Sequence, residues 1–73
     1  MSMLKTKLYG ALNSHYQAKK SKALFQLQLS FENTVAIGEH PQLVDDCIKL
    51  IDDVAGADES IQTLESYFGD VHD

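Results

Sequence analysis

The fold is decided by residues 41–68, PQLVDDCIKLIDDVAGADESIQTLESYF, which carry an unbroken seven-residue apolar repeat. One row of the repeat is Leu43, Leu50, Ala57 and Leu64, and the interleaved row is Cys47, Val54, Ile61 and Phe68. Alternating steps of three and four residues place both rows on one stripe of an α-helix. Because the repeat keeps its phase across Gly56, the sequence predicts one continuous helix rather than two short ones.

A second helix is predicted over about residues 3–34, and its apolar face is wider than two rows. Ser2 is a suitable N-cap, and good helix formers follow it. One row comprises Leu4, Ala11, Ala18 and Phe25, and a neighbouring row comprises Tyr9, Leu12, Tyr16, Ala23 and Leu27. A face this wide can contact more than one neighbour. The predicted interaction stripe combines the two rows of 41–68 with Leu4, Leu8, Tyr9, Leu12 and Tyr16.

Residues 25–31, FQLQLSF, alternate apolar and polar side chains, which is the pattern of a half-buried strand. No second segment offers a convincing strand to pair with it, and a lone strand leaves its backbone hydrogen bonds unmade. Leu24, Leu27 and Phe31 also follow helical spacing. We therefore interpret 25–31 as part of the first helix.

A turn is predicted at residues 33–40, between the two helices. Gly38 suits the left-handed conformation that ends many helices, and Pro41 suits the first position of the next helix. The predicted fold is therefore an all-α antiparallel hairpin of helices 3–34 and 41–68.

The whole chain, 1–73, is expected to form this single helical domain, with a frayed end at 70–73. A two-helix hairpin has no closed core, so large apolar side chains stay on its flanks. Burying each of them contributes about 1.5–3 kcal/mol. We expect a homodimer that completes a four-helix bundle; docking onto another protein would cover the same flanks.

Charge is divided unevenly along the chain, whose net charge is −5. Residues 1–31 contain five lysines and no acidic residue, whereas 32–73 contain all eleven acidic residues and a single lysine. An antiparallel hairpin brings the halves together, so opposite charges can set its register while contributing at most about 1 kcal/mol per exposed pair. The expected pairs are Lys22 with Asp52 or Asp53, Lys19 with Asp58, and Lys5 with Asp70.

The sequence lacks motifs for catalysis or metal binding. The acidic run 52–59 does not have the alternating carboxylates of a calcium loop, and no phosphate-binding glycine loop or nucleophile elbow occurs. The histidines, at positions 15, 40 and 72, are scattered; His15 is interpreted as an interfacial residue, with a metal site shared across a dimer as the lesser alternative. Cys47, the single cysteine, is interpreted as a small core residue. We predict no enzymatic activity, no cofactor and no metal.

The lysine cluster Lys19, Lys20 and Lys22 is the candidate for contact with an anion. The chain contains no arginine, on which bidentate base recognition relies most, and its net charge is negative. Both features disfavour nucleic-acid binding. A nucleic-acid-associated regulator that uses this cluster is therefore the alternative function and not the leading one. No apolar run approaches the roughly 20 residues of a membrane span, and the N-terminus lacks a signal-peptide pattern. We expect a soluble cytoplasmic protein without membrane contact.

The segment Val35-Ala36-Ile37-Gly38-Glu39-His40-Pro41 separates a tyrosine-containing helix from an acidic helix with leucine spacing. On these residues, the stretch 8–68 resembles short uncharacterised helical proteins encoded by tailed phages of marine bacteria, cyanobacterial phages especially. The resemblance implies expression in the cytoplasm of a bacterial host, assigns no catalytic or binding residue, and leaves virion incorporation open. The expected function is a non-enzymatic interaction or structural accessory protein of phage origin that self-associates through its heptad stripes.

Overall fold

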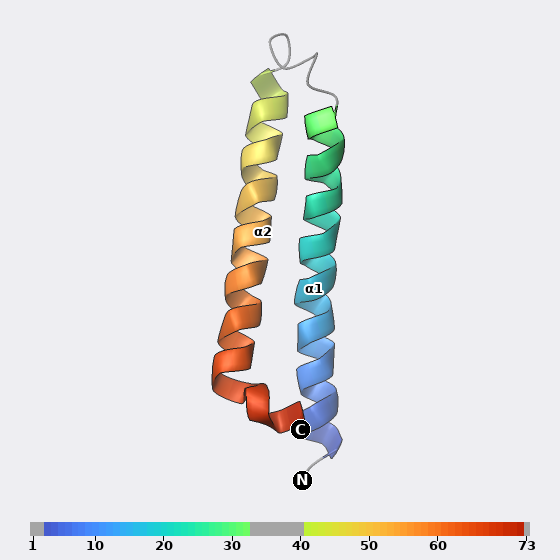
Figure 1. Cartoon of the computed structure of the whole chain (residues 1–73), viewed down its shortest axis with the longest axis vertical. Helices are drawn as coiled ribbons and strands as arrows, with labels where there is room; N and C mark the ends of the chain where they lie inside the picture. Colours follow the sequence, from blue (N-terminus) through green and yellow to red (C-terminus); the bar gives the residue numbers. More distant parts are fainter. Residues whose placement is uncertain (1–2, 33–40, 73) are drawn as a thin grey trace.

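The computed structural model describes residues 3–32 and 41–72, and within these ranges the chain is helical and contains no strand. Helix α1 spans Met3–Glu32, helix α2 spans Pro41–Phe68, and a 3₁₀ helix, η2, spans Gly69–His72. The two long helices lie side by side and antiparallel in a rod of 56 × 16 × 13 Å (Figure 1). The predicted all-α hairpin is confirmed.

Helix α1 runs without a break through residues 25–31, which confirms the helical interpretation of that segment. The continuous second helix is confirmed as well, because α2 passes through Gly56 and ends at Phe68. The described part of the expected frayed end, residues 70–72, belongs to η2.

The expected N-cap Ser2 and the expected turn at 33–40 lie outside the described residues. The side chains of Pro41, Val71 and His72 also lie outside them. The described helices nevertheless begin and end close to the predicted bounds, with α1 ending at Glu32 instead of about residue 34.

The contact between the helices, here called the seam, is formed on α2 by the two apolar rows of the heptad repeat. Ala57 and Leu64 are buried, with 1% and 8% of their surface exposed. The half-buried members are Leu43, Cys47, Leu50, Val54 and Ile61. Phe68, the last member, lies where α2 ends and stays exposed. The repeat therefore supplies the α2 side of the seam along its whole length.

On α1 the seam follows the same steps of three and four residues, but several of its members are polar. In chain order these members are Tyr9, Asn13, Tyr16, Lys20, Ala23, Leu27 and Ser30. Tyr9, Ala23 and Leu27 are buried, and the other members are half-buried. The α1 side of the seam is thus less apolar than the α2 side.

The α1 residues expected in the interaction stripe do not all lie in the seam. Tyr9 and Tyr16 belong to it, whereas Leu4 and Leu8 are 76% and 60% exposed and Leu12 lies at its edge. Helix α1 carries apolar side chains around most of its circumference, so apolarity alone does not identify the row that meets α2. Ala23 is the most buried member of the α1 row that meets α2, at 3% exposed.

Polar contacts also join the two helices among the described residues. The Tyr9 hydroxyl donates a hydrogen bond of 2.8 Å to Glu65 Oε2. The Lys20 Nζ atom lies 2.6 Å from Asp58 Oδ1. The sequence prediction had assigned Lys19 to Asp58; this is corrected, because the seam passes through Lys20 and leaves Lys19 one position to its side.

The hairpin leaves an unusually large surface in contact with solvent. Its accessible surface is 5693 Å², whereas a compact monomer of 8.1 kDa is expected to expose about 4,500 Å². The excess is roughly 1,200 Å², because an elongated two-helix rod encloses less of its surface than a compact fold does.

Replacing Gly10 or Gly56 by alanine should stabilise the protein. Both glycines lie inside helices, and a Cβ built at either position meets no atom within 4 Å. Because glycine costs a helix interior about 0.8–1.0 kcal/mol relative to alanine, each substitution should raise the free energy of unfolding by about 1 kcal/mol. Urea unfolding followed by circular dichroism measures the change. Gly69→Ala is the matched control, since Gly69 lies beyond the end of α2, in η2, and not in an α-helix interior; an equal gain there would contradict this reasoning.

Leu64→Ala should lower the free energy of unfolding by about 2–3 kcal/mol, because it empties a buried position of the seam. The same substitution at the exposed Leu4 should change it by less than about 0.5 kcal/mol. The pair of variants has identical chemistry and differs in location only. Similar losses at both positions in urea titrations would mean that the seam is assigned to the wrong residues.

Candidate functional site

The seam divides the rod into two long sides, and one of them carries a charged hollow of about 560 Å³. It lies in the half of the rod where α1 ends and α2 begins. Its polar lining residues are Lys19, Lys22 and Gln26 from α1 and Asp46, Lys49 and Asp53 from α2. Positive and negative side chains therefore share this hollow, and Lys22 and Asp53, which were expected to pair, both border it.

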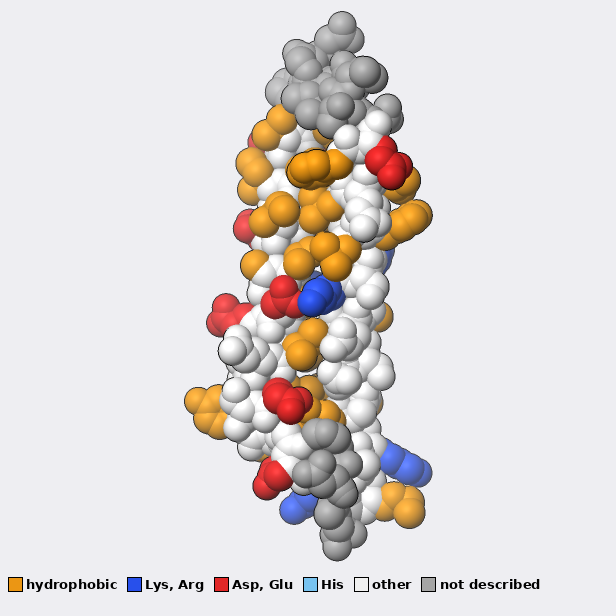
Figure 2. All heavy atoms as spheres, in the orientation of Figure 1, with side chains coloured by type: hydrophobic (Ala, Val, Ile, Leu, Met, Phe, Trp, Pro, Cys, Tyr) orange, Lys and Arg blue, Asp and Glu red, His pale blue; other side chains and the backbone are white. Residues whose placement is uncertain are grey.

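The other side of the same half carries a group of exposed apolar side chains, here called the apolar face. It consists of Leu24 and Phe31 from α1 and Val44, Ile48 and Ile51 from α2. Leu24 is the least exposed of the five at 38% and Phe31 the most at 69%. Figure 2 shows apolar side chains gathered over both helices in this half of the rod.

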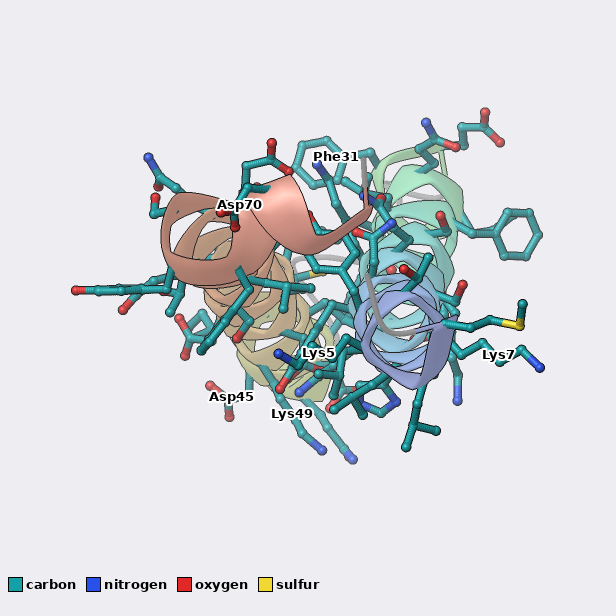
Figure 3. The ribbon with its side chains drawn as sticks, turned by 90° about the horizontal axis from the view of Figure 1, so that it is seen from below. Lys5, Lys7, Phe31, Asp45, Lys49 and Asp70 are labelled. Atoms are coloured by element: carbon teal, nitrogen blue, oxygen red, sulfur yellow. The ribbon has the colours of Figure 1, made fainter. Side chains whose placement is uncertain are left out.

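Helical spacing explains why these residues lie on the side opposite the charged hollow. At about 100° per residue, Asp53 lies about 60° to one side of the seam residue Leu50 and Ile51 about 100° to the other. On α1, Gln26 lies about 60° around the helix to one side of the seam residue Ala23, and Leu24 lies about 100° to the other side. Viewed along the helices, Lys5 and Lys49 lie on one side of the hairpin and Phe31 on the other (Figure 3).

The apolar face ends near the middle of the rod. The α2 row that begins with Val44 and Ile51 continues, at seven-residue steps, with Asp58 and Glu65. Asp58 pairs with Lys20, and Glu65 accepts the hydrogen bond from Tyr9. Figure 2 shows an acidic and a basic side chain side by side just below the apolar group. The same side of the rod is thus apolar in one half and polar in the other.

A second hollow, here called the terminal hollow, lies near the start of α1 and the end of α2. It has a volume of about 370 Å³ and is lined by Lys5, Leu8, Tyr9, Leu12, Leu64 and Phe68. Five of these residues belong to the predicted interaction stripe. The structure therefore brings Leu8 and Leu12 beside Leu64 and Phe68, although Leu8 is largely exposed. Leu4 is not among the lining residues.

The lysine cluster does not form a continuous basic surface. Lys20 is turned into the seam and paired with Asp58. Lys19 and Lys22 border the charged hollow together with Asp46 and Asp53. An approaching polyanion would meet acidic and basic side chains together, which weakens the electrostatic attraction that nucleic-acid binding depends on.

Other residues with potential chemistry are dispersed. His15 is exposed, and its ring meets that of Tyr16 edge to face at 4.9 Å between centroids. Cys47 is a half-buried free thiol in the seam. In the described part of the chain, no three His, Cys, Asp or Glu side chains are grouped so that they could hold a metal ion. His40 lies outside that part.

Neither described helix contains a stretch both long and apolar enough to cross a bilayer. Three lateral features of the rod have been described: the apolar face, the charged hollow and the terminal hollow. Their lining residues come from both helices in every case.

The sequence prediction did not single out the α2 part of the apolar face. Its signal is visible in retrospect, since Val44, Ile48 and Ile51 form a second apolar row at steps of four and three residues beside the main repeat. The stronger heptad repeat drew attention to the row that contacts α1. A second row on a helix already paired through its first row indicates another neighbour.

Comparisons with family models, with curated proteins and with solved structures find no match to this chain. What the protein does must therefore be argued from its own surfaces.

The Lys20–Asp58 pair should select the register of the hairpin more than it stabilises it. Both side chains are more than a third exposed, at 35% and 49%, so solvent screens their attraction. A double-mutant cycle with Lys20→Gln and Asp58→Asn should give a coupling energy below about 1 kcal/mol. The coupling energy should fall further in 1 M salt, because the Debye length there is only about 3 Å. Urea unfolding of the four proteins measures it. A coupling of several kcal/mol that persists in salt would show that the pair is a main source of stability.

Proposed function

We propose that this chain is a non-enzymatic helical interaction protein that self-associates, with two hairpins packing their apolar faces together to complete a four-helix bundle. The observation that carries the proposal is the apolar face itself. Five large apolar side chains from both helices lie exposed on one side of the rod, and none of the described residues covers them. Contiguous apolar patches of this kind are typical of protein–protein contacts.

The amount of exposed surface supports a partner of substantial size. The hairpin exposes 5693 Å², roughly 1,200 Å² more than a compact monomer of its mass. A standard stable interface removes about 800 Å² from each partner. One such contact would bring most of the excess out of water.

Charge favours one arrangement of the two hairpins. Helix α1 is basic, with Glu32 as its single acidic residue, and α2 is acidic, with Lys49 as its single basic residue. A twofold axis parallel to the rod places each α1 beside the partner's α2, so that the basic helix lies beside the acidic helix. An axis perpendicular to the rod would instead place the two basic helices side by side. Because Lys19 and Lys22 border the charged hollow on the opposite side of the rod, this preference comes from the overall charge of the helices and not from ion pairs within the contact.

The proposed setting is that of a phage accessory protein in the cytoplasm of a bacterial host. Its support is the resemblance carried by residues 35–41 within the stretch 8–68. An interaction or structural role also fits the exposed apolar side chains that both helices carry on one side of the rod. A nucleic-acid-associated regulator is not favoured, because Asp46, Asp53 and Asp58 lie among the lysines of the cluster.

Size-exclusion chromatography with light scattering tests the proposal over a tenfold range of protein concentration. The wild-type mass should be twice the chain mass of 8.1 kDa. Replacing Ile48 and Ile51 together by glutamine should weaken dimerisation by at least about tenfold, because each dimer loses four buried apolar side chains. The helix content, followed by circular dichroism, should stay unchanged.

The matched control replaces Phe25 and Leu29 by glutamine. These residues are as exposed as Ile48 and Ile51 but lie off the apolar face, and the dimer should persist. A wild-type mass of 8.1 kDa at every concentration would overturn self-association. A dimer unaffected by the Ile48 and Ile51 substitutions would show that another surface is used.

A further inference from the structure

Helix α1 carries a second pair of heptad rows outside the seam, here called the outer stripe; two of its members, Leu8 and Lys22, also border the terminal hollow and the charged hollow. Its members, at alternating steps of four and three residues, are Leu4, Leu8, Ala11, His15, Ala18, Lys22, Phe25 and Leu29. Every one of them is exposed. At about 100° per residue, Phe25 lies about 200° around the helix from the seam residue Ala23, so most of this stripe faces away from the hairpin.

The outer stripe stays uncovered in the proposed bundle as well. There, α1 meets its own α2 through the seam and the partner's α2 through the side that carries Leu24 and Phe31. Phe25 and Leu29 lie beyond both contacts and are 61% and 50% exposed in the hairpin. The stripe is therefore available whether or not the hairpins associate, and an inference about it does not rest on the proposed function.

On α1 itself, basic side chains accompany the outer stripe and no acidic side chain does; Asp46 and Asp53 of α2 share the charged hollow with Lys19 and Lys22 at the margin of the stripe. In a helix pair, the positions flanking the apolar rows select the charge of the partner. Here those positions include Lys7 and Lys19, and Lys22 lies within the stripe itself. Figure 3 shows the Lys7 side chain directed away from α2. The first acidic residue of α1 is Glu32, at its last position.

These charges decide between possible occupants of the stripe. A second copy of α1 would bring lysine against lysine along the whole contact. The outward rows of α2 have the right charge but lack apolar residues, since they consist of Gln42, Asp45, Lys49, Asp52, Gly56 and Glu59. We propose that the outer stripe binds an acidic amphipathic helix of another protein.

The shape of the stripe adds a requirement on that partner helix. Large side chains stand at its ends, at Leu4, Leu8, Phe25 and Leu29, whereas Ala11 and Ala18 occupy its middle. The partner should therefore carry its bulkiest apolar residues at its centre. From Leu4 to Leu29 the stripe is about 37 Å long, which matches a helix of about 25 residues. Two narrow rows interrupted by His15 and Lys22 suit a helix better than a lipid surface, which prefers a wide apolar face.

A synthetic probe tests the proposal directly. The probe is a peptide of about four heptads with leucine in both apolar rows and glutamate at the flanking positions, where the like charges keep it from pairing with itself. Its matched partner has lysine in place of every glutamate. Fluorescence anisotropy with labelled peptide, at low salt and in 0.5 M salt, measures binding to the full chain; the Debye length falls from about 30 Å at 0.01 M salt to about 3 Å at 1 M.

The glutamate probe should bind at least about tenfold more tightly than the lysine probe, and more weakly as salt rises. Phe25→Gln with Leu29→Gln should weaken binding by about tenfold or more, whereas Ile48→Gln with Ile51→Gln should leave it unchanged. Backbone amide chemical shifts should change around Ala11 and Ala18. Because the second double variant is the one designed to dissociate the dimer, failure of this inference and failure of self-association give different results.

Several results would overturn the inference. They are the absence of saturable binding at about 1 mM protein, equal affinity for the two probes, and unchanged affinity after the outer-stripe substitutions. Shift changes along the seam residues Ala23, Leu27 and Ala57 would mean that the probe replaces α2 instead. Binding to vesicles containing anionic phospholipid, without binding to the peptide, would identify a lipid surface as the occupant and would also overturn it.

Discussion

The rest of the structure depends on one constraint, the packing of α1 against α2 along the seam. Two small residues are the most buried part of it. Ala57 and Ala23 are 1% and 3% exposed and are the most buried side chains of the described residues. They hold the axes of α1 and α2 close together, and the larger Leu27, Leu64 and Tyr9 fill the space on either side. Ordering the chain costs conformational entropy. Because few of the described side chains are buried, the seam offsets that cost by only a modest amount.

A heptad repeat by itself does not fix how far one helix is shifted along the other. A shift by seven residues would again place apolar rows in the seam, but it would move Lys20 from Asp58 to Ile51 in one direction and to Glu65 in the other. In the first case Lys20 loses its carboxylate partner, and in the second Tyr9 loses Glu65. Polar groups within an otherwise apolar contact commonly select one alignment in this way, at some cost in stability.

How far the sequence predicted the structure differs between the two helices for a physical reason. Helix α2 has one unbroken heptad repeat, so its bounds and its seam residues follow from periodicity alone, although Val44, Ile48 and Ile51 form a second, shorter apolar row. Helix α1 has apolar side chains on several sides, and the row that meets α2 includes Asn13, Lys20 and Ser30, which no apolar pattern would select. Asp58 pairs with Lys20 and not with Lys19 because Lys20 lies in that row. Since the apolar pattern does not identify the row, it does not identify the pair either.

The ends of the described chain give the rod a direction. Met3 and His72 lie at one end of a rod 56 Å long, and the apolar face occupies the half toward the other end (Figure 1). In a bundle with its twofold axis along the rod, both copies would bring these ends together, away from the apolar contact. A fluorophore, an affinity tag or a second protein attached at either terminus would then be held at a distance from that contact. In that bundle, the length of the hairpin would separate a group attached at either terminus from the contact between the two copies.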